Sequence, residues 1–512
     1  MNTSHSIIQN SQMNDSSSEA NVDIDFDDIS FNITKKGGYF DALNLFILQK
    51  ANQSDYADRN ATILLLDMNG YVIKELVSPG SRWAFAYAIN SSTILLGLFD
   101  TNIYFWNIYD DSLTKYEMGW YHHDMSYNPI SNTILSIYNM DVDVNSTVYH
   151  TDVLREKELN GNIVWEYDTF NSIVYPSMWN GFEFVGGTAD VSHTNTVYWD
   201  VEEDVIYVNM RNINTFYKIN RTTSEVIWGL GEYGDFTLYD LSGNRKTNLF
   251  YHAHAVEPLD KNTFILFDND VYNDTNPNNR KSRILELKID ESEMTANVSW
   301  SWVAPSDYYS SYWGDADRLP NGNRLGVFGT VTHPSTSIGA RLCEINNEGD
   351  IVWEMNFPND EDYNYGVYKM ERLGLHPFIT TESYFVNSST QDVIVSWDVY
   401  YNFRSKWKTY GSYQLLVDQR KIEDSNIGFS KYWAPTKITS DLGVLEPGHH
   451  NITILVLDET GLNGVSSSIF IEINGTSNKS VLLDLFPILI VGSASITGVT
   501  IIVYLKKHNE LE

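Results

Sequence analysis

The sequence predicts an all-β protein: a six-bladed β-propeller, followed by an immunoglobulin-like β-sandwich and one C-terminal transmembrane helix. Three observations support this fold class. A strand-and-turn unit repeats through the first two-thirds of the chain, shorter alternating strands follow it, and an uncharged apolar run lies near the end. Aromatic residues are 14% of the 512 residues. Many are Trp or Tyr in alternating stretches, which favours strands over helices.

The repeated unit contains a Gly- or Asn-type turn and then a strand that often carries Trp. Examples are 66–73 (LDMNGYVI), 158–165 (ELNGNIVW) and 344–353 (EINNEGDIVW). The units recur about every 40 to 70 residues, the range for propeller blades with insertions. Six units are counted, near 39–78, 82–117, 121–168, 192–230, 251–303 and 315–356. The strand 366–372 is expected to close the ring on the first unit, which removes exposed sheet edges. Unrelated β-meanders are the alternative, which the shared turn residues disfavour.

After about residue 373 the pattern changes to short alternating strands, such as 393–399 and 451–457, which are typical of an immunoglobulin-like sandwich. The predicted divisions are a disordered segment rich in Ser, Asn and Asp (1–35), the propeller (36–372), the sandwich (373–474), a linker (475–484), the transmembrane helix (485–505) and a cytoplasmic tail (506–512).

The apolar run 485–505 carries no charge and is long enough to span a bilayer. Lys506 and Lys507 follow it directly, so the positive-inside rule places the tail in the cytoplasm and the propeller and sandwich outside the cell. A buried core helix is the alternative. The N-terminus shows neither a basic start nor an apolar run, so no signal peptide is recognised. Glycosylation sequons agree with an extracellular location and include those that begin at Asn32, Asn60, Asn90, Asn145, Asn220, Asn273, Asn297, Asn387, Asn451 and Asn474.

Charge and cysteine content narrow the class of protein. The formal net charge is −33, and such a surface repels phosphate backbones, which argues against nucleic-acid binding. Cys343 is the single cysteine, so the chain can form neither an intrachain disulfide nor a Cys-rich metal site.

Histidines open three successive units. His122 and His123 begin the third unit, His193 begins the fourth, and His252 and His254 begin the fifth. The innermost strands of a propeller converge on the central channel, so these side chains can meet there. His252 and His254 are expected to share one strand face, because side chains alternate with period two. A purely structural role for each histidine is the alternative, and the convergence of three units favours a shared site.

Several segments carry a resemblance to a known family. They are 122–124 (HHD), 192–197 (SHTNTV), 208–212 (VNMRN), 219–231 (INRTTSEVIWGLG), 250–255 (FYHAHA), 267–270 (FDND) and 318–323 (RLPNGN). In order and content, over about residues 40–372, they resemble the nucleotide-independent arylsulfotransferases, also called arylsulfate sulfotransferases. The resemblance implies a propeller enzyme without a cofactor. Its expected substrates are a small aromatic sulfate donor and a phenolic acceptor.

The resemblance also implies roles for individual residues. His254 is expected to attack sulfur and form a covalent sulfo-histidine, which divides one difficult step into two. Arg211, His193 and Asn195 are expected to hold the sulfuryl oxygens, where charge is spread in the transition state. A strand-end salt bridge is the alternative for Arg211, and a turn cap is the alternative for Asn195.

Two further roles concern protons and substrate contact. His122 or His123 is expected to stabilise or shuttle a proton at the phenol oxygen. The family commonly has Gln-His-Asp where this chain has Ala253-His254-Ala255, and His252 is expected to replace that Asp partly and to contact substrate.

Other interpretations remain open at this point. The stretch 268–279 (DNDVYNDTNPNN) could bind calcium, but it lacks a regular ligand spacing, so a solvated insertion and no metal are expected. The Trp-containing turns are also found in quinoprotein dehydrogenases, but no cofactor motif is recognised. Nothing resembles a nucleotide-sulfate binding loop. The alternative to an enzyme is a non-catalytic cell-surface propeller that binds a ligand or a partner.

Overall fold

The structure is a computed structural model of the whole chain, and it confirms the all-β prediction. It describes residues 22–474 and 492–493, with internal gaps at 27–28, 55–58, 78–83, 99–100, 174–183, 186–187, 272, 274–275, 331–337, 388, 402–408, 432–433 and 462.

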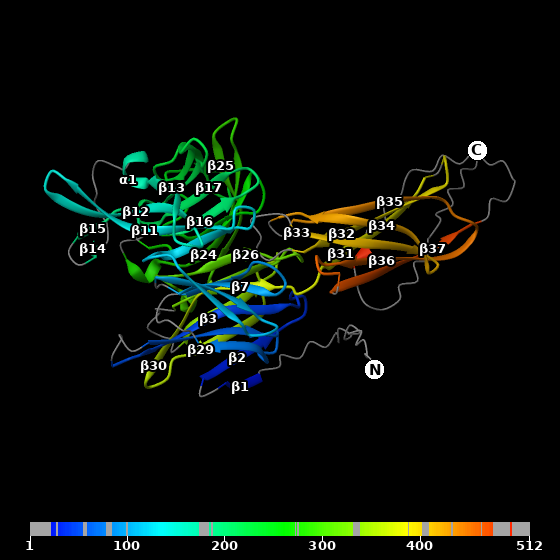
Figure 1. Cartoon of the computed structure of the whole chain (residues 1–512), viewed down its shortest axis with the longest axis horizontal. Coiled ribbons are helices and arrows are strands. Elements are labelled where there is room, and N and C mark those ends of the chain that lie inside the picture. Colours follow the sequence, from blue (N-terminus) through cyan, green and yellow to red (C-terminus); the bar gives the residue numbers. More distant parts are fainter. Residues whose placement is uncertain are drawn as a thin grey trace, which may run out of the picture.

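Most described strands form six sheets whose innermost strands contact one another in a ring. The C-terminal strands form a two-sheet sandwich beside it (Figure 1). Each sheet of the ring is built around four antiparallel strands. From the innermost strand outward, the first sheet has β30 (Tyr363–Leu373), β3 (Leu43–Asn52), β4 (Arg59–Leu66) and β5 (Val72–Val77). The second has β6 (Ala84–Ala88), β7 (Thr93–Leu98), β8 (Asn102–Asn107) and β9 (Leu113–Glu117). The third has β10 (His122–Asn128), β11 (Thr133–Val144), β12 (Thr147–Glu158) and β13 (Ile163–Asp168).

The other three sheets follow the same pattern. The fourth has β16 (Thr194–Asp200), β17 (Val205–Met210), β18 (Thr215–Asn220) and β19 (Glu225–Gly231). The fifth has β22 (His254–Pro258), β23 (Thr263–Asp268), β24 (Arg283–Asp290) and β25 (Thr295–Val303). The sixth has β26 (Asp315–Arg318), β27 (Arg324–Phe328), β28 (Ile338–Ile345) and β29 (Ile351–Pro358).

The ring closes through its innermost strands. Each of β30, β6, β10, β16, β22 and β26 contacts the next, and β26 contacts β30. The late strand β30 completes the first sheet by pairing with the early strand β3, with Leu43 opposite Leu373. Joining the early and late strands in one sheet closes the ring, and the short inner edges of the six sheets then lie close to one another around its centre.

Tryptophan side chains explain why Trp recurs in the repeated unit. An indole N–H on the fourth strand of one sheet donates to a turn of the following sheet. The pairs are Trp165 with Ser224 Oγ (3.1 Å), Trp228 with Glu291 Oε1 (3.0 Å), Trp302 with the Gly349 carbonyl (2.9 Å) and Trp353 with the Met68 carbonyl (3.1 Å). The last pair joins the sixth sheet to the first. Each indole packs apolar surface against the neighbouring sheet while its N–H group keeps a hydrogen-bond partner. These residues therefore join adjacent sheets.

The prediction of disorder over residues 1–35 is wrong for the end of that segment. Strand β2 (Ile29–Lys35) pairs with β29, with Asn32 opposite Asn356, and β1 (Val22–Phe26) pairs with β2. Ile29, Phe31 and Ile33 are buried against the core of the sixth and first sheets. Their period-two alternation is a strand signal that the polar composition of the segment obscured. Residues 1–21 lie outside the described residues.

The remaining short elements of the ring are insertions between or within these sheets. They are α1 (Thr169–Ser172), β14 (Phe184–Val185), β15 (Thr188–Asp190), η1 (Arg211–Ile213), β20 (Thr237–Tyr239), β21 (Arg245–Lys246), η2 (Pro277–Asn279) and η3 (Ser306–Tyr308). Strand β15 runs parallel to β12, and β20 runs parallel to β25.

The sandwich consists of two four-stranded antiparallel sheets. One sheet has the order β35 (Thr436–Val444), β32 (Asp392–Tyr400), β31 (Phe378–Val386) and β38 (Gly492–Ser493). The other has the order β34 (Arg420–Phe429), β33 (Thr409–Val417), β36 (Gly448–Leu457) and β37 (Gly464–Ile473). Strands β32 and β36 alternate buried and partly buried residues, as expected for two sheets that pack face to face.

The sandwich is fastened to the ring. Lys431 Nζ lies 2.7 and 2.6 Å from the two carboxylate oxygens of the buried Asp200, and Ser91 Oγ donates to Glu459 Oε1 (3.0 Å). One continuous hydrophobic cluster also includes Trp106 of the ring and Trp397 of the sandwich. The two parts therefore share a core as well as polar contacts.

The predicted membrane helix 485–505 lies outside the described residues except for Gly492 and Ser493. These two residues are extended in β38 and pair with Glu382 and Thr381, so they do not support a continuous helix. In the described ranges, no helix is long and apolar enough to cross a membrane. The extracellular location therefore stays a prediction.

Candidate functional site

A left-handed backbone recurs where the chain enters the innermost strands. His123 (φ 58°), His193 (φ 43°), His252 (φ 55°) and Trp313 (φ 58°) lie at or just before the starts of β10, β16, β22 and β26. Bulky residues seldom adopt this conformation, because it costs about 1–3 kcal/mol and must be imposed by the surrounding structure. Four such residues at equivalent positions in four sheets indicate that the surrounding structure holds them in place for a functional site.

The left-handed turn at His252 overturns one expectation. His252 and His254 do not share a strand face, because β22 begins only at His254 and the period-two rule does not extend across a left-handed residue. The backbone N–H of His252 donates to Asn214 Oδ1 (2.9 Å), which helps to hold this turn.

A chain of hydrogen-bonding groups joins β12, β10 and β16. Asp152 Oδ2 accepts from Ser192 Oγ (2.6 Å) and the Thr194 N–H (2.7 Å), and Asp152 Oδ1 lies 3.0 Å from His122 Nε2. His122 Nδ1 in turn lies 2.7 Å from His123 Nδ1. Burial opposes ionisation of Asp152, but the charge and hydrogen bond of His122, with these two donors, lower its pKa, so it stays a carboxylate.

The same contacts order the protons on the two imidazoles. A carboxylate accepts only, so the His122 Nε2 atom that faces Asp152 carries a proton. In the form of His122 that accepts at Nδ1, His123 Nδ1 is the donor in the 2.7 Å contact, and the lone pair of His123 lies on Nε2. The His123 ring lies 4.9 Å from the His193 ring, and His193 Nδ1 is hydrogen-bonded to Asp190 Oδ2. In that form, His123 can accept a proton from a substrate at Nε2.

His254 is held from two sides. Its Nδ1 lies 2.6 Å from Asn269 Oδ1, and its ring packs edge-on against Tyr368, with centroids 6.3 Å apart. Tyr368 also packs against His123 at 6.3 Å and against Trp313 at 5.9 Å. The closing strand β30 thus places an aromatic ring between two histidines from different sheets.

Arg211 supplies the positive charge of the cluster. It is the first residue of η1, directly after β17, is 2% exposed, and donates from Nη1 to Asn212 Oδ1 (3.1 Å). Asn212 Nδ2 donates to the Asp190 carbonyl (2.7 Å), so the segment before His193 helps to fix the guanidinium.

Burial and nearby positive charge keep three of the histidines, His123, His252 and His254, neutral. Desolvation is the main cause that lowers the pKa values of His254 and His252 well below 6.5, and repulsion from Arg211 comes second for both. Desolvation also lowers the pKa of His123, with further repulsion from His193 and His122. A neutral imidazole is a nucleophile or a base, whereas an imidazolium is neither.

Asn195 is engaged by the protein. Its Nδ2 donates to the Ala253 carbonyl (2.8 Å), its Oδ1 accepts from Asn209 Nδ2 (2.7 Å), and Asn209 also donates to the Ala253 carbonyl (2.7 Å). Asn195 therefore holds the backbone just before His254, and its predicted contact with a sulfuryl oxygen stays a prediction.

The structure thus brings together the sequence-predicted residues His122, His123, His193, His252, His254 and Arg211, with Asn195 behind them. Sequence reasoning missed Asp152, Asp190, Asn212, Asn269 and Tyr368 as partners of that set. Asp190, three residues before His193, and Asn212, directly after Arg211, were the most accessible signals. Asp152, Asn269 and Tyr368 belong to different strands or sheets from the histidines they contact, so no local spacing could reveal them.

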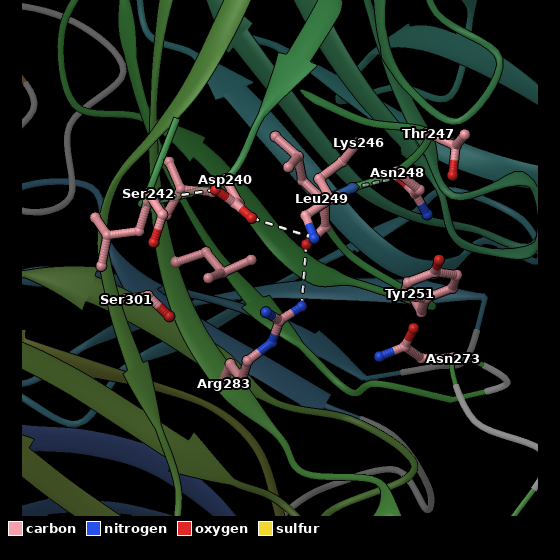
Figure 2. A pocket seen from close by; sticks show the side chains of 13 residues that line it. Asp240, Ser242, Lys246, Thr247, Asn248, Leu249, Tyr251, Asn273, Arg283 and Ser301 are labelled. Atoms are coloured by element: carbon pink, nitrogen blue, oxygen red, sulfur yellow. Dashed lines mark hydrogen bonds and ion pairs between the residues drawn. The ribbon is translucent and has the colours of Figure 1, made fainter. Parts of the chain in front are cut away.

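A separate cavity of about 480 Å³ lies beside the segment that leads to His252 (Figure 2). Arg283 on its wall donates to the Leu249 carbonyl (3.0 Å) and pairs with Asp268, and Lys246 Nζ lies 3.2 Å from Asp240. Because these cations are already neutralised, the cavity does not resemble a site for a sulfuryl group.

The calcium interpretation of 268–279 finds no support in the described part of that stretch. Asp268 accepts from the Tyr251 and Asp270 N–H groups and pairs with Arg283, and Asp270 accepts from Asn273 and the Lys281 N–H. Nowhere in the described residues do three or more His, Cys, Asp or Glu side chains form a group that could hold a metal ion.

The buried neutral histidines predict how stability depends on pH. His123, His252 and His254 have pKa values well below 6.5 in the folded protein, whereas in the unfolded chain they take up protons near 6.5. At a pH between the folded and the unfolded pKa values, these histidines bind protons only in the unfolded state. The free energy of unfolding should therefore fall as the pH drops below about 6.5, by up to about 1.4 kcal/mol per pH unit for each histidine.

Urea denaturation at a series of pH values checks this prediction. Above pH 7 these groups are neutral in both states and add no slope. A His252→Gln variant should show a smaller loss of stability between pH 7 and pH 5 than the parent. An equal loss in both proteins would contradict it.

Fold and site together define the class of protein: an all-β, propeller-like protein whose inner strands carry a cluster of histidines around one buried arginine. The family model described as arylsulfotransferase (ASST) matches residues 35–369. The chain belongs to the arylsulfotransferase family, which confirms the resemblance seen in its motifs.

Comparisons with curated sequences and with solved structures do not add to the assignment of a function. No curated protein sequence matches the chain. Hydrazine synthase from Kuenenia stuttgartiensis aligns with 65% of this chain and 80% of its own, at 11% identity and a TM-score of 0.30. A hypothetical selenium-binding protein from Sulfolobus tokodaii aligns with 86% of this chain and 92% of its own, at 9% identity and a TM-score of 0.33. Scores this low carry no argument about function.

Proposed function

We propose that the protein is an enzyme that transfers a sulfuryl group from an aryl sulfate ester to a phenolic acceptor through a sulfo-histidine at His254. The ring of six sheets acts as a six-bladed propeller whose inner strands carry the site. The observation that supports this most is the buried, neutral His254 next to the positive charge of Arg211, in a chain of the arylsulfotransferase family.

The first half-reaction uses the lone pair of His254. His254 Nε2 attacks sulfur, the N–S bond forms, and the S–O(aryl) bond breaks with its electron pair leaving on the phenolate. Arg211, with its guanidinium fixed by Asn212, stabilises the negative charge spread over the sulfuryl oxygens. His193, which lies beside His123, contributes a further donor to these oxygens.

The second half-reaction returns the sulfuryl group to a phenol. The acceptor oxygen attacks sulfur, the N–S bond breaks, and His254 recovers its lone pair. His123 Nε2 takes the proton of the acceptor hydroxyl, while His122 and Asp152 hold the His123 ring in the required tautomer. His123 then releases this proton to solvent, so the two half-reactions return the site to its starting state without a redox cofactor or a nucleotide.

A two-substrate kinetic experiment tests this proposal. The purified protein is mixed with 4-nitrophenyl sulfate, and 4-nitrophenolate release is recorded with and without a phenol acceptor. We expect about one equivalent of nitrophenolate per chain in a burst with donor alone, and ping-pong kinetics with acceptor. A folded protein that shows neither a burst nor turnover would favour the alternative, a propeller that binds a ligand without catalysis.

A further inference from the structure

We propose that Asn269 is a positioning residue that selects the tautomer of His254 and makes Nε2 the nucleophilic atom. The inference rests on the proposed function for its catalytic meaning, but the tautomer itself follows from hydrogen bonds alone. Asn269 comes directly after β23 and is fully buried.

The orientation of the Asn269 side-chain amide is determined by two carbonyl groups. Its Nδ2 donates to the Ser310 carbonyl (2.9 Å) and to the Trp313 carbonyl (2.7 Å). A flipped amide would place Oδ1 against two acceptor oxygens, which is repulsive. Nδ2 must therefore face the loop before β26, and Oδ1 must face His254.

An amide oxygen can only accept, so the 2.6 Å contact requires a proton on His254 Nδ1. The other tautomer would bring the Nδ1 lone pair against the Oδ1 lone pairs. A neutral His254 therefore carries its proton on Nδ1 and its lone pair on Nε2. When Nε2 becomes bonded to sulfur, the positive charge of the ring is stabilised at Nδ1 by the same amide oxygen.

The loop that holds Asn269 is itself well supported. Ser282 Oγ donates to the Ser310 carbonyl (3.1 Å) and accepts from the Ser310 N–H (3.0 Å), and Trp313 packs against Tyr368 at 5.9 Å. Tyr368 in turn packs against His254. The imidazole is therefore held from one side by Asn269 and from another by Tyr368, and both contacts depend on the position of Trp313.

A neutral amide and a carboxylate beside His254 have different effects on its protonation. A carboxylate at this place would favour the imidazolium, because an opposite charge stabilises the protonated ring. Asn269 sets the tautomer without that charge, so His254 keeps its lone pair at lower pH, next to the repulsive charge of Arg211. The pH dependence of the burst is therefore the most informative measurement.

Two variants separate positioning from simple structural support. Asn269→Asp should move the acidic limb of the burst rate with 4-nitrophenyl sulfate to higher pH, by at least about one unit. Asn269→Leu should slow the burst about 10- to 100-fold at saturating donor, because the tautomer and the ring orientation are no longer selected. The matched control is Asn128→Asp on β10, where Oδ1 accepts from the Ile130 N–H (2.9 Å) and a carboxylate can do the same. It should leave the pH profile unchanged.

A direct readout does not depend on activity. In full-length protein labelled with ¹⁵N-histidine, with the His254 signals assigned by comparison with His254→Ala, we expect the Nδ1–H tautomer in the parent protein. Asn269→Asp should raise the pH at which His254 titrates. The Nε2–H tautomer in the parent, or an unchanged titration in Asn269→Asp, would overturn the inference.

The two proposals can fail separately. If the tautomer is Nδ1–H but His254→Ala keeps its burst, the proposed function fails while Asn269 still orients the ring. If the burst requires His254 but neither Asn269 variant changes its rate or pH profile, the inference about Asn269 fails alone. If Asn269→Leu does not fold, the tautomer of His254 in the parent protein and the titration of His254 in Asn269→Asp still test whether Asn269 selects the tautomer.

Discussion

His254→Ala is expected to abolish both the burst of 4-nitrophenolate and the covalent sulfuryl adduct. Alanine has no lone pair to donate, and a neighbouring imidazole would have to attack sulfur from a different position, out of line with the leaving phenolate. The parent protein mixed with donor alone should gain the mass of one sulfuryl group on the peptide that contains His254. Intact-protein and peptide mass spectrometry measure the adduct, and stopped-flow absorbance measures the burst.

His254→Asn keeps a polar side chain without a comparable nucleophile and should behave in the same way. His450→Ala is the matched control, because His450 is partly exposed in the sandwich and pairs with Asp418. It should keep the full burst. A His254→Ala protein that turns over as fast as the parent would mean that another residue carries the sulfuryl group, or that the protein does not catalyse this reaction.

Arg211→Ala is expected to slow the burst by roughly 10²–10³, the usual effect of losing one charge-stabilising contact in a transition state. Arg211→Lys should restore little of the rate, because an ammonium is a point charge and cannot replace two N–H groups of a planar guanidinium. The burst amplitude should stay near one equivalent, since His254 remains.

A second consequence of the Arg211→Ala change concerns pH. Repulsion from Arg211 contributes to the low pKa values of His254 and His252, so removing the charge makes protonation of both easier. The acidic limb of the burst rate should therefore move to higher pH. Arg245→Ala on the exposed hairpin strand β21 is the control and should change neither rate nor pH profile. An Arg211→Ala protein with the parent rate and profile would remove Arg211 from the site.

The repeated unit could be recognised in the sequence because the sheets of the ring share the same local features. A turn reverses the chain, and a fourth strand carries a Trp that reaches the next sheet. The pair Trp165 with Ser224 spans 59 residues, but both partners occupy their usual places in the unit. Periodicity therefore revealed the repeat without any knowledge of the contact.

Local alternation was a poorer guide at the site itself. The expectation that His252 and His254 share a face assumed a regular strand, and the left-handed backbone at His252 removes that regularity. Residues in this conformation are held by contacts from elsewhere, in this case from Asn214, which no spacing rule includes. The prediction of disorder for residues 29–35 was wrong for the opposite reason. The alternation of a strand was present there, but the polar composition of the surrounding segment concealed it.

By itself, the sequence determined the all-β class, the repeated unit, the family, and the histidines and arginine that belong to one site. These features depend on local patterning and on residue types at the starts of strands, both of which are properties of short stretches. Only the tertiary structure decided which partner each imidazole has. Asn269 contacts His254 across fifteen residues, Asp152 lies beside His122, and Tyr368 packs against His254 from the strand that closes the ring. Those partners select the tautomers, and they meet only because ring closure brings the inner strands of separate sheets to one place.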